Sequence, residues 1–294
     1  MTSEAEFTVV IPCYNEEGAI AETLEELSQE LMGERPFHIV VVDDGSKDRS
    51  PAILAELEAR IPQLRVVTHK RNRGYGAALK TGFRQAKSEF VVITDADGTY
   101  PNHRIPQLVA MARDRQLDML VGARVGSDVQ YSKLRAIPKI FLKAWVSFLV
   151  GESVPDMNSG LRVFRRAVTL PYLKLLPNSF SFTTTVTIAF LCAEQAVHYE
   201  PIAYKARIGQ SKIKPIRDTL RFCQLILRTG MYFAPIRALT PVIALLGMGF
   251  LVSASYDVFI IGDLTDKTVI LAMFTLNAVL FALLADMLVK RFNA

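Results

Sequence analysis

The chain has 294 residues, a formal net charge of +5 and a hydrophobic content of 50%. A net charge this small does not indicate nucleic-acid binding, and no nucleic acid is expected as a partner. The length allows one or two domains, and the mean hydropathy of +0.24 is high for a soluble protein. The amino-terminal MTSEAEF has neither a basic nor an apolar stretch, so no secretory signal peptide is expected.

Short apolar runs alternate with helical patterns between residues 6 and 125. Continuous apolar runs of this length indicate strands that are buried on both faces, as in a parallel sheet. The expected strands are Phe7–Ile11, Phe37–Val42, Arg65–Thr68, Phe90–Thr94 and Met119–Val121. The pattern predicts an α/β fold with a Rossmann-like, mostly parallel sheet, whose ligands bind beyond the carboxyl ends of the strands.

Acidic residues follow three of these strands. Glu16 comes after the first, Asp43 and Asp44 after the second, and Asp95 and Asp97 after the fourth. Carboxylates crowded at one sheet edge need a cation or hydrogen-bond donors. In the Asp-Ala-Asp sequence the two carboxylates point to the same side of an extended chain, which suits Mg²⁺ or Mn²⁺ with substrate phosphates completing the shell. The alternative is a turn without metal, since Asp and Gly favour turns.

A glycine-containing segment, RGYGAAL at residues 73–79, follows the third strand and opens a helix. Leu79 takes the place of the third glycine of a dinucleotide-binding fingerprint, and the first strand has no glycine-rich turn. Both features argue against a Rossmann dehydrogenase. A loop that approaches a nucleotide and a plain helix start both remain open.

Two basic amphipathic stretches precede the carboxyl terminus. In residues 131–150, Arg135, Lys139 and Lys143 are spaced four apart opposite aromatic and aliphatic residues, as in a helix that lies in the membrane interface. Residues 216–236 repeat this pattern beside a transmembrane segment, where clustered cations attract anionic headgroups. The alternative for each stretch is a surface helix packed on the sheet.

Two long apolar segments, at about 238–260 and 268–289, follow within residues 237–294. Each is long enough to span a bilayer. Buried core helices are the alternative, but they would need a larger surrounding protein. Arg237 precedes the first segment, and Lys290 and Arg291 follow the second. By the positive-inside rule we expect a cell-membrane protein with two spans, whose preceding domain and both termini are cytoplasmic.

Five motifs in this order and spacing resemble the family 2 glycosyltransferases with a GT-A fold: VVIPCYNEE, VVDDGSKD, NRGYGAALKTGF, ITDADGTYP and DMNSGLRVFRR. The closest similarity is to the branch that includes dolichol-phosphate mannose synthases and bacterial polyprenyl-phosphate glycosyltransferases. The resemblance covers about residues 6–215 and implies a GT-A catalytic domain at 1–215. The juxtamembrane segment 216–236 and the transmembrane hairpin 237–294 would follow it.

The resemblance implies roles for the matching residues. Contacts to a nucleotide sugar are implied for Pro12, Tyr14, Glu16, Asp43, Asp44, Asp95, Ala96 and Asp97. Asp95 and Asp97 would hold the divalent metal, and Asp97, Arg207 and Lys212 would be catalytic. The acceptor side would comprise Ser159, Arg162, Arg207, Ser211 and Lys212. For Arg207 and Lys212 a solvated or lipid-facing charge run is the alternative.

The sequence departs from relatives that act on hydroxyl groups. These carry an acidic general base at the start of a late helix, where this chain reads FTTT at 182–185. A phosphate monoester, with a second pKa near 6, needs no base. We therefore expect an inverting, metal-dependent transfer from a GDP- or UDP-linked sugar to a polyprenyl or dolichyl phosphate.

Two alternatives to this reaction remain. The first is transfer to a hydroxyl of a lipid-linked glycan, and the second is a non-catalytic membrane subunit that binds a nucleotide sugar. The sequence leaves open which sugar and base are used and whether a homo-oligomer forms.

Overall fold

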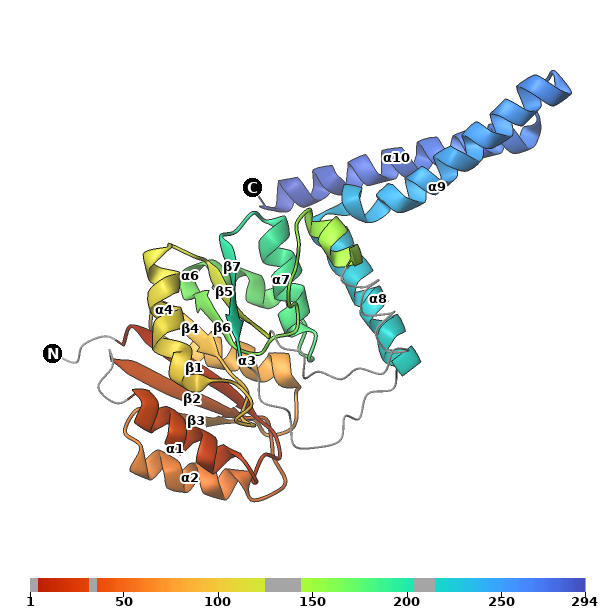
Figure 1. The fold of residues 1–294 in the computed structure, drawn as a ribbon. Helices are drawn as coiled ribbons and strands as arrows, with labels where there is room; N and C mark the ends of the chain where they lie inside the picture. The colour runs from red at the N-terminus through yellow and green to blue at the C-terminus, as the bar shows by residue number, and fades with distance from the viewer. Residues whose placement is uncertain (1–4, 32–35, 125–143, 204–214, 294) are drawn as a thin grey trace. The chain divides into compact units, whose positions relative to one another are not determined.

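The computed structural model describes residues 5–31, 36–124, 144–203 and 215–293 (Figure 1). These residues divide into two compact units. The first lies within residues 1–137 and 154–215, and the second within 138–153 and 216–294.

A seven-stranded sheet forms the centre of the first unit, in the order β3-β2-β1-β4-β6-β5-β7. The strands are β1 (Phe7–Cys13), β2 (Phe37–Asp43), β3 (Leu64–Thr68), β4 (Phe90–Ile93), β5 (Met119–Arg124), β6 (Arg162–Arg165) and β7 (Val197–Ile202). β1 pairs in parallel with β2 and β4, β2 with β3, and β5 with β7. The predicted α/β fold with a mostly parallel sheet is confirmed, and the expected strands correspond to β1–β5.

Helices cover both faces of the sheet (Figure 1). They are α1 (Ile20–Leu31), α2 (Ser50–Arg60), α3 (Tyr75–Gln85), η1 (Asn102–Arg104), α4 (Ile105–Asp114), α6 (Arg166–Thr169), η2 (Leu170–Lys174) and α7 (Phe182–Cys192). Successive side chains of a strand point to opposite faces. Val9 and Ile11 of β1 therefore join the apolar cluster of α1, α2 and α4, whereas Val10 joins that of α3 and α7. Burial on both faces accounts for the unbroken apolar runs.

β6 is the antiparallel member of the sheet and was not predicted. It lies between β4 and β5 and pairs antiparallel with both. Its first residue, Arg162, is opposite Ile93 at the end of β4. This register places the turn at residues 156–160, which immediately precedes β6, beside the Asp-Ala-Asp sequence that follows β4.

The second unit contains the two apolar segments. It includes a helix at residues 144–150. Its other helices are α8 (Pro215–Phe233), α9 (Pro235–Tyr256), η3 (Asp257–Ile261) and α10 (Asp266–Asn293). The spans Pro235–Ile261 and Asp266–Arg291 are long and apolar enough to cross a membrane, with mean hydropathies of 1.9 and 2.3. In the most apolar 18-residue stretch of each span, only 11% of the residues are buried. The exposed apolar side chains therefore need an apolar surrounding such as lipid.

A small polar cluster closes the turn of this hairpin. The Asp257 carboxylate accepts hydrogen bonds from the backbone and hydroxyl of Thr265 and from the hydroxyl of Thr268. The bond to the Thr265 backbone satisfies an N–H group at the start of α10 that has no carbonyl partner within the helix.

We predict that Gly82→Ala destabilises the first unit. A Cβ at Gly82 in α3 would lie 2.2 Å from Val10 Cγ1 at the centre of the sheet. Overpacking of a core costs about 1–3 kcal/mol, which outweighs the roughly 0.5–1 kcal/mol gained by replacing a helical glycine with alanine. Thermal unfolding in detergent should show a lower midpoint.

Gly18→Ala is the matched control, because a Cβ there would meet nothing within 4 Å. An unchanged midpoint for Gly82→Ala would contradict the close packing of α3 on β1.

Candidate functional site

A cavity of about 360 Å³ lies beyond the carboxyl ends of β1, β2 and β4. All its lining residues belong to the first unit. They are Pro12, Cys13, Tyr14, Glu16, Asp44, Asn72, Gly74, Tyr75, Ala78, Asp95, Ala96, Asp97, Asn158, Gly160, Phe180 and Thr183. The cavity thus contains seven of the eight residues expected to contact the nucleotide sugar, the exception being Asp43.

Asp43 and Asp44 are adjacent in sequence but have different surroundings. Asp43 is buried, with Oδ1 accepting a hydrogen bond from the Ser46 backbone at 3.0 Å. Its Oδ2 is buried without a hydrogen-bond partner among the described residues. Asp44 lines the cavity, where its Oδ2 accepts hydrogen bonds from the backbone N–H groups of Arg73 (3.0 Å) and Gly74 (2.7 Å). Asp44 therefore shapes the loop that begins α3.

The His69 ring completes the surroundings of Asp44. Its Nδ1 lies 2.6 Å from Asp44 Oδ1, and its Nε2 lies 2.9 Å from the hydroxyl of Thr81 in α3. Both His69 and Asp44 are buried. The pair ties the end of β2 and the end of β3 to α3.

Asp95 is positioned by Tyr75 and Gly160. The Tyr75 hydroxyl donates a hydrogen bond to Asp95 Oδ1 at 3.1 Å. Burial, followed by the charge of Asp95, raises the pKa of Tyr75 well above its usual value, so the phenol stays protonated and remains a donor. A Cβ at Gly160 would lie 2.7 Å from Asp95 Oδ2. The absence of a side chain at Gly160 therefore makes room for the Asp95 carboxylate.

Asp97 faces the same cavity, and its Oδ1 accepts a hydrogen bond from the Thr99 hydroxyl at 2.7 Å. No group of three or more His, Cys, Asp or Glu side chains in the described ranges could hold a metal ion. Two carboxylates are nevertheless a suitable protein contribution for Mg²⁺ or Mn²⁺, because such ions commonly take their other ligands from phosphates and water. The residues present fit a divalent cation that binds together with a phosphate-bearing substrate.

Cys13 also lines the cavity but is not a nucleophile. Burial, followed by the charges of Asp43 and Glu16, raises the pKa of its thiol to about 12. Because the reactive form of cysteine is the thiolate, this side chain is inert at neutral pH.

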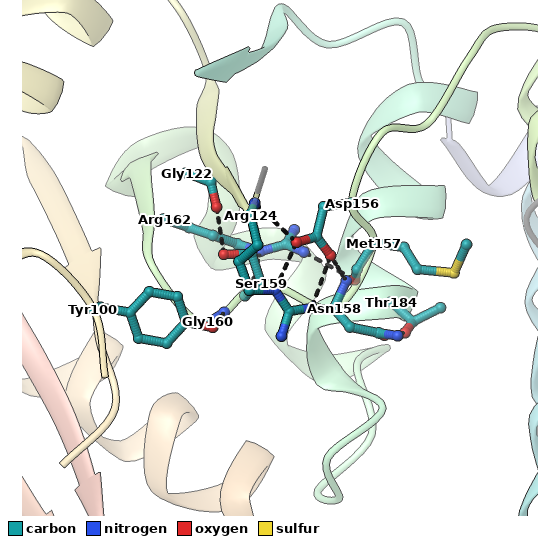
Figure 2. Close-up of polar contacts among 10 residues, drawn as sticks. All are labelled: Tyr100, Gly122, Arg124, Asp156, Met157, Asn158, Ser159, Gly160, Arg162 and Thr184. Carbon is teal, nitrogen blue, oxygen red and sulfur yellow. Dashed lines mark hydrogen bonds and ion pairs between the residues drawn. The ribbon is translucent and has the colours of Figure 1, made fainter. Parts of the chain in front are cut away.

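The turn at residues 156–160, shown in Figure 2, contributes Asn158 and Gly160 to one wall of the cavity. Arg124, at the end of β5, donates hydrogen bonds from Nε and Nη2 to the two oxygens of Asp156, at 2.7 and 2.9 Å. Burial alone would raise the pKa of Asp156, but the hydrogen bonds and charge of Arg124 lower it below its usual value. This contribution to stability is present at neutral pH and is lost as the pH falls through the lowered pKa.

Arg162 also holds this turn in place. Its side chain is fully buried and donates to the backbone oxygens of Ser159 and Met157, both at 2.9 Å, and to the Thr187 hydroxyl at 2.7 Å. Ser159 is also buried, and its hydroxyl donates to the Gly122 carbonyl. The expectation that Ser159 and Arg162 face the acceptor differs from this geometry, in which both side chains point into the protein and fix the turn (Figure 2).

Asn158 also lines the cavity and belongs to the motif DMNSGLRVFRR that the resemblance placed on the acceptor side, whereas Tyr75, Phe180 and Thr183 were not expected as site residues. Asn158 Oδ1 accepts a hydrogen bond from Thr184 at 2.7 Å, which leaves the amide N–H₂ as the donor group of that side chain. The one signal in the sequence was the pair Gly74 and Gly76, whose missing side chains allow residues 177 and 178 to approach.

The expected residues Arg207, Ser211 and Lys212 lie outside the described residues, as does most of the expected interfacial helix at 131–150. Their roles remain predictions.

The chain is similar in sequence to known proteins. The model of the family "Glycosyl transferase family 2" matches residues 8–170. An undecaprenyl-phosphate 4-deoxy-4-formamido-L-arabinose transferase of Pseudomonas fluorescens is 32% identical over 262 residues, covering 84% of this chain and 72% of that protein. The low-salt glycan biosynthesis hexosyltransferase Agl6 of Haloferax volcanii is 27% identical over 75% of this chain. The chain spans about half of that relative, 52% of its length.

A solved structure has the same fold. Glucosyl-3-phosphoglycerate synthase from Mycobacterium tuberculosis, in complex with Mn²⁺, uridine diphosphate and glucosyl-3-phosphoglycerate, aligns with a TM-score of 0.55. The alignment covers 76% of this chain and 78% of that one at 20% identity, a level that shows the fold alone.

We predict that Gly160→Ala lowers turnover by on the order of 10², the loss expected when a reacting group is displaced by about 1 Å. The new Cβ would push the Asp95 carboxylate away from its place in the cavity. Steady-state kinetics would measure the loss, and a thermal-shift assay with Mn²⁺ and a nucleoside diphosphate should show weaker metal-dependent binding.

Gly18→Ala again serves as the control. Wild-type turnover in a folded Gly160→Ala variant would show that the position of Asp95 does not limit the reaction.

Proposed function

The chain belongs to glycosyl transferase family 2 and is a glycosyltransferase, and we propose that it transfers a sugar from a nucleotide-diphosphate sugar to a polyprenyl phosphate. One observation carries the choice of acceptor. In the described part of the cavity the carboxylates are Glu16, Asp44, Asp95 and Asp97, and the first turn of α7 has no acidic residue. Asp156, in the same turn as Asn158 and Gly160, is paired with Arg124 and does not line the cavity, so the described lining of this wall contributes no carboxylate as a general base.

The missing base suits an acceptor that is already ionised. A hydroxyl group needs a base to take its proton, whereas a phosphate monoester is largely ionised at neutral pH. The similarity to an undecaprenyl-phosphate sugar transferase, at 32% identity, supports the same acceptor class.

On the donor side, Pro12, Tyr14 and Glu16 would contact the nucleoside. The buried, unpartnered Oδ2 of Asp43 suits a donor N–H group of the base, because an unpaired buried oxygen is costly.

Asp95 and Asp97 would hold a divalent cation, Mg²⁺ or Mn²⁺, against the diphosphate. When bound, such an ion stabilises the negative charge that develops on the leaving nucleoside diphosphate. Tyr75 and Gly160 keep the Asp95 carboxylate in place. The acceptor phosphate would attack the anomeric carbon from the face opposite the leaving group, and the reaction would invert that centre.

The two apolar helices would anchor this unit in the cell membrane, where the acceptor lipid resides. Arg237 lies in the first turn of the first span, and Lys290 and Arg291 lie at the end of the second, so these cations share one end of the hairpin. By the positive-inside rule this end, and the glycosyltransferase unit with it, would be cytoplasmic.

The nature of the product tests the proposed acceptor. With purified protein, labelled donor sugars and undecaprenyl phosphate in detergent, we expect a metal-dependent lipid product that mild acid hydrolyses, because the sugar is joined through a phosphodiester. Asp97→Asn and excess EDTA should each abolish its formation. An acid-stable lipid glycoside would instead identify a hydroxyl acceptor.

A second test concerns Arg207, for which we propose a catalytic role together with Lys212. The leaving diphosphate and the attacking monoester repel each other, so a cation between them would stabilise the transition state more than either ground state. Arg207→Ala should lower kcat by on the order of 10² to 10³. Arg207→Lys should recover part of this loss, because lysine keeps the charge but cannot form the two-pronged contact of arginine.

Nucleotide affinity should change little in either variant. A rise in the KM for lipid with an unchanged kcat would assign Arg207 to membrane contact and remove it from catalysis.

A further inference from the structure

Phe180 is an unusually exposed apolar side chain at the edge of the cavity. Its relative exposure is 81%, whereas the other exposed large apolar side chains described in the first unit, Tyr14 and Leu175, are 41% and 42% exposed. Phe180 nevertheless lines the cavity. Exposed apolar surface beside a ligand cavity commonly marks a binding surface.

The segment that carries Phe180 is fixed to the start of α3. Cβ atoms at Gly74 and Gly76 would lie 2.4 Å and 2.3 Å from the carbonyl oxygens of Asn178 and Pro177, so only glycine permits this approach. The Ala77 N–H donates to the Asn178 carbonyl at 3.2 Å, and Lys80 Nζ donates to Asn178 Oδ1 at 2.8 Å. The main chain before Phe180 is therefore held by several independent contacts.

The Phe180 ring is also held in orientation. It stacks on the ring of Tyr75, with centroids 5.2 Å apart and an interplanar angle of 19°. The Tyr75 hydroxyl in turn donates to Asp95 Oδ1. One face of the Phe180 ring is thus occupied by Tyr75. Through Tyr75, the ring is linked to Asp95, the carboxylate that would hold the metal on the diphosphate.

We propose that Phe180 binds the first isoprene units of the polyprenyl-phosphate acceptor, next to its phosphate group. This inference rests on the proposed function. The isoprene chain is joined directly to the attacking phosphate, so an apolar side chain at the rim of the reaction cavity meets that part of the acceptor. Phe180 offers only carbon and hydrogen, and burying it against lipid releases the water on its open face.

The donor sugar is the other ligand that an aromatic ring could contact. Sugar hydroxyls need hydrogen-bond partners, which the same cavity provides at Asn158 and at the buried Thr183. Thr183 is 4% exposed, whereas Phe180 is 81% exposed, so Phe180 is the more open of these two cavity residues. The position at the rim favours the incoming lipid.

The test uses the full chain in detergent, with undecaprenyl phosphate as acceptor and the nucleotide sugar that the wild type turns over. Phe180→Ala should raise the KM for the lipid by on the order of 10- to 100-fold, the range expected when a large apolar side chain is no longer buried by its ligand. The KM for the donor and the affinity for nucleoside diphosphate should stay near wild type. Phe180→Leu should restore most of the lipid KM, because lipid contact requires apolar area and not an aromatic ring.

Leu175→Ala is the matched control, since Leu175 is an exposed apolar residue of the same connection that does not line the cavity. Its lipid KM should equal that of the wild type.

Three results would overturn the proposal. A wild-type lipid KM in Phe180→Ala would show that the ring does not meet the acceptor. A raised donor KM that leucine fails to restore would assign the ring to the sugar, where stacking needs an aromatic face. Failure of the wild type to glycosylate any polyprenyl phosphate, while it glycosylates a hydroxyl acceptor, would overturn the proposed function and this inference together.

Discussion

The geometry of the cavity depends on the buried carboxylate of Asp44. It accepts the backbone N–H groups of Arg73 and Gly74 and contacts the His69 ring. These bonds hold Gly74 at a φ of 101°, a conformation that favours glycine, and so set where α3 begins. The first residue of α3 is Tyr75, which meets both Asp95 and Phe180. An acidic residue that faces a ligand cavity thus also builds the frame around it, because it satisfies backbone donors that the helix start leaves unpaired.

The opposite wall is held by two arginines that use different partners. Arg124 pairs with a carboxylate, Asp156, whereas the fully buried Arg162 donates mainly to backbone carbonyls and a hydroxyl. Burial lowers the pKa of Arg162, but an arginine still keeps its charge at neutral pH. A buried charge is tolerable only when it is hydrogen-bonded, and here the bonds go to the turn that lines the cavity. The buried guanidinium keeps its hydrogen bonds only if residues 157–159 hold their conformation, so its burial helps to fix that conformation.

The sequence predicted the sheet well because its signal is local. β1 and β2 are mostly apolar and buried along nearly their whole length, with His38 of β2 as the exposed exception, which follows from burial on both faces. β6, with the sequence RVFR, escaped prediction because it is four residues long and bounded by arginines. The acidic residues at the strand ends were also readable, since parallel strands bring their carboxyl ends together.

The parts of the site that could not be predicted depend on burial and on distant pairs. A sequence shows that Arg162 is charged but not that its side chain is enclosed, and the family resemblance placed it on the acceptor side of the site. Likewise the sequence does not distinguish Asp43 from Asp44, although Asp44 lines the cavity and Asp43 does not. The contact between Tyr75 and Phe180 joins residues from separate segments. Gly74 and Gly76 leave room for a close neighbour, but the sequence does not show that this neighbour is the segment before Phe180.

The position of β6 in the sheet leaves one edge of the sheet unpaired while the protein is being synthesised. β3, β2, β1 and β4 all come from the first third of the chain, and they can pair as soon as they leave the ribosome. β4 then has one edge with unpaired backbone groups until β6 is synthesised and inserts beside it, much later in the sequence. Such an edge can pair with other chains. β6, which follows the turn that forms one wall of the cavity, thus also covers an edge of the nascent sheet. A ribosome stalled before residue 162 would display an incomplete domain prone to aggregation.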